Sequence, residues 1–123
     1  MSLVLKGKKG IGFSFAWNGL KELIRTEMNF RIQTIIFLIV LLIGILLQLT
    51  NMEWVIICLV SGIVLICEVL NTVVEKLVDY IKPEMHPTAK VIKDMSAAAV
   101  LIASIVAIVV GLFIFLPKIV ELL

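Results

Sequence analysis

Apolar residues gather in three long runs along the chain, and this pattern predicts three helices that cross a membrane. The runs cover about residues 32–49, 54–81 and 95–116. A crossing helix needs about 20 predominantly apolar residues, and the purely apolar part of the second run, from Trp54 to Cys67, is shorter than that. The second crossing therefore includes the polar turns that follow Cys67, or those turns lie at the membrane surface.

A shorter segment ahead of the first run, about residues 12–26, predicts an amphipathic helix. Its large apolar residues recur at intervals of four, three and four: Phe13, Trp17, Leu20 and Ile24. That spacing places them on one helical face. Such a helix lies in the plane of a membrane surface or packs as an arm on neighbouring helices, and these two interpretations are compatible.

The composition agrees with a membrane protein. Of the 123 residues, 62% are hydrophobic, and the mean hydropathy is +1.19, whereas soluble domains are about 45–50% apolar. The net charge of +2 gives no indication of nucleic-acid binding. Because the sequence contains no repeats and no linkers, it predicts a single all-α integral membrane domain over residues 1–123.

Lysine and arginine residues are distributed unevenly around the three runs. Six of them precede the first run, none lies in the loop at residues 50–53, four lie between the polar end of the second run, at Lys76, and the start of the third, and one follows the third. Cationic residues stay on the cytoplasmic side of a membrane. We therefore predict a multi-pass protein with a cytoplasmic N-terminus and an external C-terminus.

Four polar residues stand near the end of the second run at helical spacing: Glu68, Asn71, Glu75 and Asp79. Intervals of three and four residues put them on one face of the helix. Glu68 directly follows the apolar stretch, and an acid at membrane depth is costly, so it is a functional candidate by default. A lone intramembrane glutamate also serves as a proton or cation site in transporters, and the spacing alone leaves that alternative open.

Two further polar groups are expected at the same membrane surface. Glu27 stands where the amphipathic helix meets the first run, and Lys90, Lys93 and Asp94 precede the third run. Carboxylates and an asparagine carbonyl suit Mg²⁺ held together with phosphates, lysine neutralises phosphate oxygens, and a poorly hydrated glutamate can act as general base. Phosphoryl transfer requires these parts, although the lysines are equally consistent with ordinary interfacial anchors.

Three helices are too few to shield buried acids from lipid, so we expect a homo-oligomer in which neighbours share their polar faces.

The sequence lacks the nucleotide motifs of P-loop proteins and of protein kinases. A kinase with this sequence would therefore have another fold.

Three blocks of the sequence resemble the prokaryotic diacylglycerol kinase family. The string from Glu68 to Asp79 closely matches the family signature E-x-x-N-[ST]-x-x-E-x-x-x-D. The pairs His86-Pro87 and Ala89-Lys90, followed by Lys93-Asp94-Met95, match the next block, and residues 25–31 resemble the N-terminal block. The blocks occur in the family's order and cover the chain from about residue 10 to Lys118.

This resemblance implies a small homotrimeric kinase of the bacterial cell membrane that uses MgATP to phosphorylate a lipid hydroxyl. By position, Glu68 resembles the catalytic base, Asn71 the residue that orients the site, and Glu27 and Glu75 the acids that carry Mg²⁺. The nucleotide contacts that the resemblance implies are Lys8, Glu27, Glu75, Glu84, Met85, His86, Lys93 and Asp94. The lipid contacts that it implies are Glu68, Asn29, Phe30, Arg31 and Ala97.

The expected lipid follows from the branch of the family. The Arg-Thr-Glu-x-Asn-Phe block and the closing Phe115-Leu116-Pro117-Lys118 resemble the Gram-positive branch, which is more similar to undecaprenol kinases than to diacylglycerol kinases. Undecaprenol is therefore the expected substrate and diacylglycerol the alternative. The sequence departs from the pattern at Phe15, where some members carry Tyr, and at Ala97, where the enterobacterial type carries Ser, so both positions lack a hydroxyl.

Overall fold

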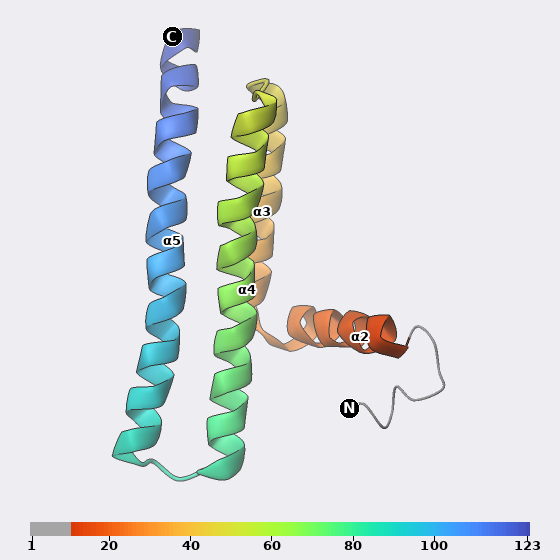
Figure 1. Cartoon of the computed structure of the whole chain (residues 1–123), viewed down its shortest axis with the longest axis vertical. Helices are drawn as coiled ribbons and strands as arrows, with labels where there is room; N and C mark the ends of the chain where they lie inside the picture. The colour runs from red at the N-terminus through yellow and green to blue at the C-terminus, as the bar shows by residue number, and fades with distance from the viewer. Residues whose placement is uncertain (1–10) are drawn as a thin grey trace.

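The computed structural model describes residues 11–123 and contains four helices within that part of the chain. They are α2 (Ile11–Thr26), α3 (Met28–Leu46), α4 (Asn51–Ile81) and α5 (Pro87–Leu122). The three long helices run side by side, with α4 packed against both α3 and α5, and α2 projects sideways from the start of α3 (Figure 1). The predicted all-helical architecture is confirmed.

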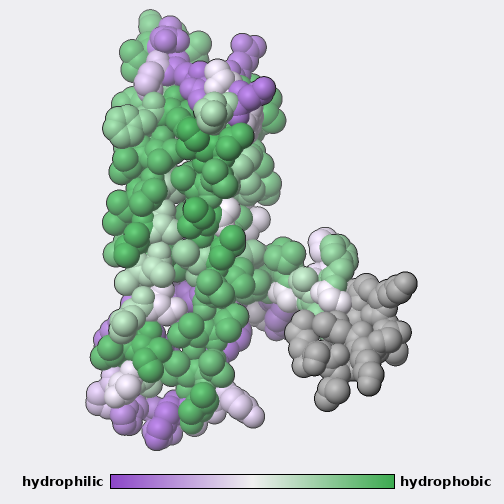
Figure 2. Space-filling view, viewed as in Figure 1, coloured by the Kyte–Doolittle hydropathy of each residue, from purple (hydrophilic) through white to green (hydrophobic). Residues whose placement is uncertain are grey.

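The lengths of the three long helices can be compared with the thickness of a bilayer. All three are long and apolar enough to span one. The 19 residues of α3 rise about 28 Å, close to the ~30 Å thickness of a hydrocarbon core. With 31 and 36 residues, α4 and α5 rise about 46 Å and 54 Å, so both are longer than a hydrocarbon core is thick. Hydrophilic residues accordingly gather at the two ends of the molecule, with an apolar band between them (Figure 2).

Residues at the helix ends explain where α4 and α5 begin and where the chain turns before α4. Helix α4 begins with a capping box, in which the Thr50 hydroxyl accepts a hydrogen bond from the Glu53 amide and the Glu53 carboxylate accepts one from the Thr50 amide. The preceding turn contains Gln48 in the left-handed region, with a φ of 56°. Helix α5 begins at Pro87, a residue preorganised for a first helical position. These signals make the connections short.

Ion pairs between helices set the register of α4 against its neighbours. Glu53 and Lys118 lie 3.1 Å apart at one end of the α4–α5 pair, and Asp79 and Lys93 form an ion pair at the other. Twenty-six residues separate the two acids on α4 and 25 separate the two lysines on α5, so both intervals correspond to a rise of about 38 Å. The two helices therefore run antiparallel with matched levels along their whole contact.

The helices extend beyond the predicted apolar runs. Helix α3 begins four residues before residue 32, and α5 begins at Pro87 rather than near residue 95. Helix α5 also continues through Pro117, where we expected the helical span to stop. A proline removes one backbone hydrogen bond, and membrane helices tolerate this loss because neighbouring groups compensate for it. The length of an apolar run reflects the thickness of the hydrocarbon core, whereas the helix itself can continue into the polar residues on either side.

Gly44 allows α3 to approach α4 closely. A Cβ atom at Gly44 would lie 2.7 Å from Cη2 of Trp54, a rigid ring that closes the first turn of α4. We expect Gly44→Ala to lower the free energy of unfolding by about 1–3 kcal/mol through overpacking, measured by denaturant titration in mixed micelles. Gly62→Ala is the matched control, because a Cβ there meets nothing within 4 Å. Equal stability of the two variants would contradict the tight α3–α4 contact.

Candidate active site

Polar side chains are buried at one place among the described residues, on the face of α4 that the other two long helices cover. Glu68 is 5% exposed, and Asn71 and Thr72 are each 7% exposed. Burying a charged or polar group without a partner is costly. The prediction that Glu68 and Asn71 share a helix face agrees with this arrangement, whereas the burial of Thr72 is an additional finding.

Glu68 has a neighbour on another helix. The side chain of Gln33, on α3, lies near the Glu68 carboxylate, and Glu75, two turns away on α4, is a charged group that acts on it. Among the described residues, α3 carries no charged side chain beyond Arg31, and α5 carries none between Met95 and Leu116. The neighbouring turns of α3 and α5 therefore bring no charged side chain to Glu68, and Glu75 on its own helix is the charged group that acts on it.

Asn71 and Glu75 lie one and two helical turns after Glu68, towards the α4–α5 loop, and their side chains form a pair. The Asn71 side-chain amide donates a hydrogen bond of 3.0 Å to Oε1 of Glu75. The Asn71 carbonyl oxygen Oδ1 is buried and has no hydrogen-bond partner among the described residues. Buried polar atoms are nearly always paired in folded proteins. This orphaned oxygen is therefore free to bind a group that the described residues do not supply.

Glu27, which precedes α3, lies near the turn of α4 that carries Glu75. It forms the break between α2 and α3, where its extended backbone interrupts the helix. Its carboxylate oxygen Oε2 lies 3.4 Å from the Lys76 ammonium on α4 and accepts a 3.2 Å hydrogen bond from the Thr26 hydroxyl. Lys76 follows Glu75 directly in the sequence, so this ion pair brings Glu27 to the height of Glu75 on α4.

The lysines before the third apolar run are held in ion pairs. Lys93 pairs with Asp79 across the two helices, and Lys90 lies 2.6 Å from Asp94 within α5. Asp79 is one turn beyond Glu75 on α4. The contact therefore holds Lys93 near the acidic face of α4. This position is consistent with both roles considered for Lys93, an anchor of the helix end and a cation that binds phosphate.

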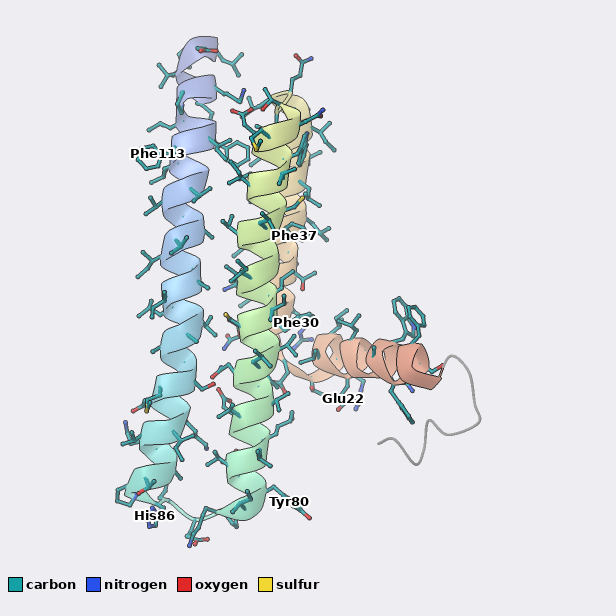
Figure 3. The ribbon with its side chains drawn as sticks, in the orientation of Figure 1. Glu22, Phe30, Phe37, Tyr80, His86 and Phe113 are labelled. Carbon is teal, nitrogen blue, oxygen red and sulfur yellow. The ribbon has the colours of Figure 1, made fainter. Side chains whose placement is uncertain are left out.

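The other predicted contacts lie farther from Glu68 in the sequence and range from buried to exposed. Glu84, Met85 and His86 lie in the α4–α5 loop, where His86 caps α5 by accepting a 3.1 Å hydrogen bond from the Thr88 amide (Figure 3). Phe30 is buried at the start of α3, Arg31 is half-buried, and Asn29 and Ala97 are exposed. Lys8 lies outside the described residues.

Glu27 and Glu75 are the carboxylates that the sequence analysis assigned to a magnesium ion. Within residues 11–123 no three acidic, histidine or cysteine side chains lie close enough to enclose a metal alone. Glu27 and Glu75 each use one oxygen in the contacts above and keep the other without a described partner. Magnesium is usually held by one or two carboxylates together with substrate phosphates. The donor set therefore fits Mg²⁺ that arrives with a nucleotide.

Gln33 was missed by the sequence analysis. It lies near the end of an apolar run, where a polar residue reads as an ordinary interfacial position. Its neighbour Thr34 directs its hydroxyl to the backbone oxygen of Phe30, at 2.8 Å, and is thereby satisfied. Only the packing of α3 on α4 distinguishes the two residues.

Comparison with known proteins shows which family the chain belongs to. Residues 14–115 match the family model of prokaryotic diacylglycerol kinases. An undecaprenol kinase of Bacillus subtilis (strain 168) is 42% identical over 106 residues, which is 86% of either chain. A diacylglycerol kinase of Synechocystis is 37% identical over 114 residues, or 92% of this chain and 65% of that protein. A diacylglycerol kinase of Escherichia coli (strain K12) is 36% identical over 101 residues, or 82% of this chain and 81% of that one. With a family model that covers most of its length and relatives that are named kinases, this chain belongs to the prokaryotic diacylglycerol kinase family, and the prediction of a lipid kinase is confirmed.

Proposed function

We propose that this protein transfers the γ-phosphoryl group of MgATP to the hydroxyl of undecaprenol, at the cytoplasmic face of the bacterial cell membrane, and that it acts as a homotrimer. The observation that carries the proposal is the buried Glu68, two helical turns from Glu75 on one face of α4. A base at membrane depth and a metal-binding acid at the surface suit an insoluble acceptor and a soluble donor.

Glu68 is the proposed general base. Its carboxylate accepts the hydroxyl proton while the lipid oxygen forms a bond to the γ-phosphorus and the bond from that phosphorus to the β–γ bridging oxygen breaks. The products are the lipid monophosphate and ADP. Asn71 holds Glu75 through its amide and offers its unpartnered oxygen to the site.

Glu27 and Glu75 are the residues that would hold Mg²⁺ with the nucleotide phosphates. The bound ion would neutralise phosphate charge and orient the nucleotide. Lys93 supplies a further positive charge from α5, and Glu84, Met85 and His86 are the proposed contacts to the rest of the nucleotide. Lys8 belongs to the same proposal on resemblance alone.

Undecaprenol is favoured over diacylglycerol by the similarity to a named undecaprenol kinase. Relatives named diacylglycerol kinases support the alternative, in which the product is phosphatidic acid. Both lipids present a primary hydroxyl, so Glu68 would serve either reaction. The earlier alternative of a proton-coupled transporter has lost its basis, because the chain belongs to a family of kinases.

A competition assay tests the substrate. Purified protein receives MgATP and equal amounts of the two lipids in mixed micelles, and the phosphorylated products are quantified. We expect a higher kcat/KM for undecaprenol. A higher value for diacylglycerol would overturn the lipid assignment and leave the kinase assignment intact, whereas no phosphorylation of either lipid would overturn both.

The proposed assembly rests on a stripe of exposed residues on α4. Between Leu59 and Glu75, the exposed residues of α4 recur strictly at intervals of four and three, and the pattern continues to Tyr80. We call this set the α4 stripe: Leu59, Ile63, Ile66, Leu70, Val73, Leu77 and Tyr80. Such spacing is the seam of helices that pack on one another. A second and a third copy of α4 are the proposed partners.

The α4 stripe continues past the bilayer. Lys76 marks the level at which α2 leaves the bundle, and Leu77 and Tyr80 lie beyond it, with Tyr80 pointing away from the other long helices (Figure 3). If α2 lies at the membrane surface, as we propose, lipid would not cover apolar side chains beyond it. Their exposure in a single chain, 54% for Leu77 and 87% for Tyr80, supports contact with another protomer.

A further inference from the structure

Side chains of all three long helices line a partly open cavity near the buried acid. Its volume is about 310 Å³, and most of its lining is apolar. Three lining residues are polar, one from each helix: Gln33 of α3, Ser61 of α4 and Ser104 of α5. Glu68 stands one helical turn from the lining residue Val64 and near Gln33. Glu68 does not itself line the cavity, and Gln33 is the lining residue that lies nearest to its carboxylate.

Ser104 is the one polar side chain of α5 between Ala97 and Leu116. A hydroxyl in an apolar environment costs free energy unless it forms a hydrogen bond. Serine in membrane helices commonly bonds to its own backbone, as Thr34 does. Within residues 11–123 the Ser104 hydroxyl forms no such bond, and its side chain lines the cavity.

The register of α4 and α5 places Ser104 at the height of Glu68. Eleven residues separate Glu68 from Asp79, and eleven separate Ser104 from Lys93, its ion-pair partner. From the other end, Glu68 is 15 residues from Glu53, and Ser104 is 14 from Lys118. The two routes agree to about 1.5 Å of helix rise. Ala103, next to Ser104, is buried, which is consistent with close packing at this level.

We propose that Ser104 is a substrate-positioning residue, whose hydroxyl holds the acceptor oxygen of the lipid opposite Glu68. The proposal rests on the proposed kinase function. The acceptor O–H donates to the Glu68 carboxylate, and its oxygen accepts from the Ser104 hydroxyl through one lone pair. The second lone pair remains free to attack phosphorus. Gln33 donates to the other Glu68 oxygen and fixes its orientation.

This arrangement also bears on the class of substrate. It provides polar partners for a single hydroxyl at the end of an otherwise apolar cavity. A prenol presents one hydroxyl and no other polar group, so its polar atoms are fully satisfied there. The ester carbonyls of a diacylglycerol would find only Ser61 deeper in the cavity, two turns from Glu68. The cavity chemistry thus favours a simple long-chain alcohol.

The test compares two serines in the same cavity. Ser104→Ala should lower kcat/KM for the lipid about three- to ten-fold, the usual effect of losing one neutral hydrogen bond, with KM for MgATP unchanged. Ser61→Ala removes the same hydroxyl about 10 Å deeper along α4 and should leave both parameters unchanged. Ser104→Thr keeps the hydroxyl and should restore most of the lost activity. Alanine is a good helix former, so neither alanine variant should unfold α5 or α4.

Each outcome discriminates. Equal losses in Ser104→Ala and Ser61→Ala would show a packing effect and overturn the proposal. Wild-type activity in Ser104→Ala, or no recovery in Ser104→Thr, would also overturn it. In both cases an active wild-type enzyme leaves the kinase function standing, whereas a wild type that phosphorylates no lipid overturns the function and this inference together.

Discussion

Glu68→Gln is expected to lower turnover by about 10²–10⁴-fold, the usual contribution of a general base, while MgATP binds nearly as in the wild type. Glutamine keeps the shape of the side chain and its hydrogen bonding towards Gln33, and it loses only the ability to accept the proton. The measurement is phosphorylation of the lipid in mixed micelles, together with nucleotide binding by calorimetry.

Glu121→Gln provides a control for this substitution. Glu121 is an exposed acid at the far end of α5, remote from the site, and its amidation should change neither quantity. Glu75→Gln should instead weaken magnesium-dependent nucleotide binding, because it removes a proposed metal ligand. Turnover of the Glu68 variant at the wild-type rate would remove Glu68 from the role of base, and a common defect in nucleotide binding would point to a shared structural cause.

Leu77→Glu is expected to dissociate the homotrimer. Leu77 belongs to the α4 stripe beyond the bilayer, so a charge there does not hinder membrane insertion. Three such charges would meet at the proposed seam, and like charges in contact repel one another. Size-exclusion chromatography with light scattering in mild detergent reports the assembly, and we expect the monomer to replace the trimer.

Val91→Glu is the matched control for the assembly. Val91 is 54% exposed, as Leu77 is, and it lies on α5 outside the α4 stripe. Its substitution should leave the oligomer intact. If Leu77→Glu remains trimeric, or if both variants dissociate, the α4 stripe is not the interface.

The sequence predicted the architecture because helix periodicity and hydropathy are local properties. The three apolar runs led to α3, α4 and α5, and the spacing of Glu68, Asn71 and Glu75 predicted a shared face that the structure also has. Helix ends were less predictable. Apolar runs end where lipid ends, whereas α4 and α5 continue as long as neighbouring helices and caps support them.

Residues whose roles depend on another helix could not be found in this way. Gln33 and Ser104 are single polar residues in apolar surroundings, and nothing in their local sequence relates them to Glu68. Their relation depends on the register of three helices, which the contacts of Glu53, Lys76 and Lys93 establish in space. The matching charges are visible in the sequence, but which acid meets which lysine is not.

Helix α4 runs without interruption from one side of the apolar band to well beyond the other, through 31 residues. In the proposed reaction, the buried turn of α4 at Glu68 faces the lipid, which stays in the membrane. The turn at Glu75 faces MgATP, which stays in water. The reactants thus remain in separate phases, and only a phosphoryl group crosses between them. A rigid rod suits this task, because it keeps the distance across the boundary constant while the fluid on either side fluctuates.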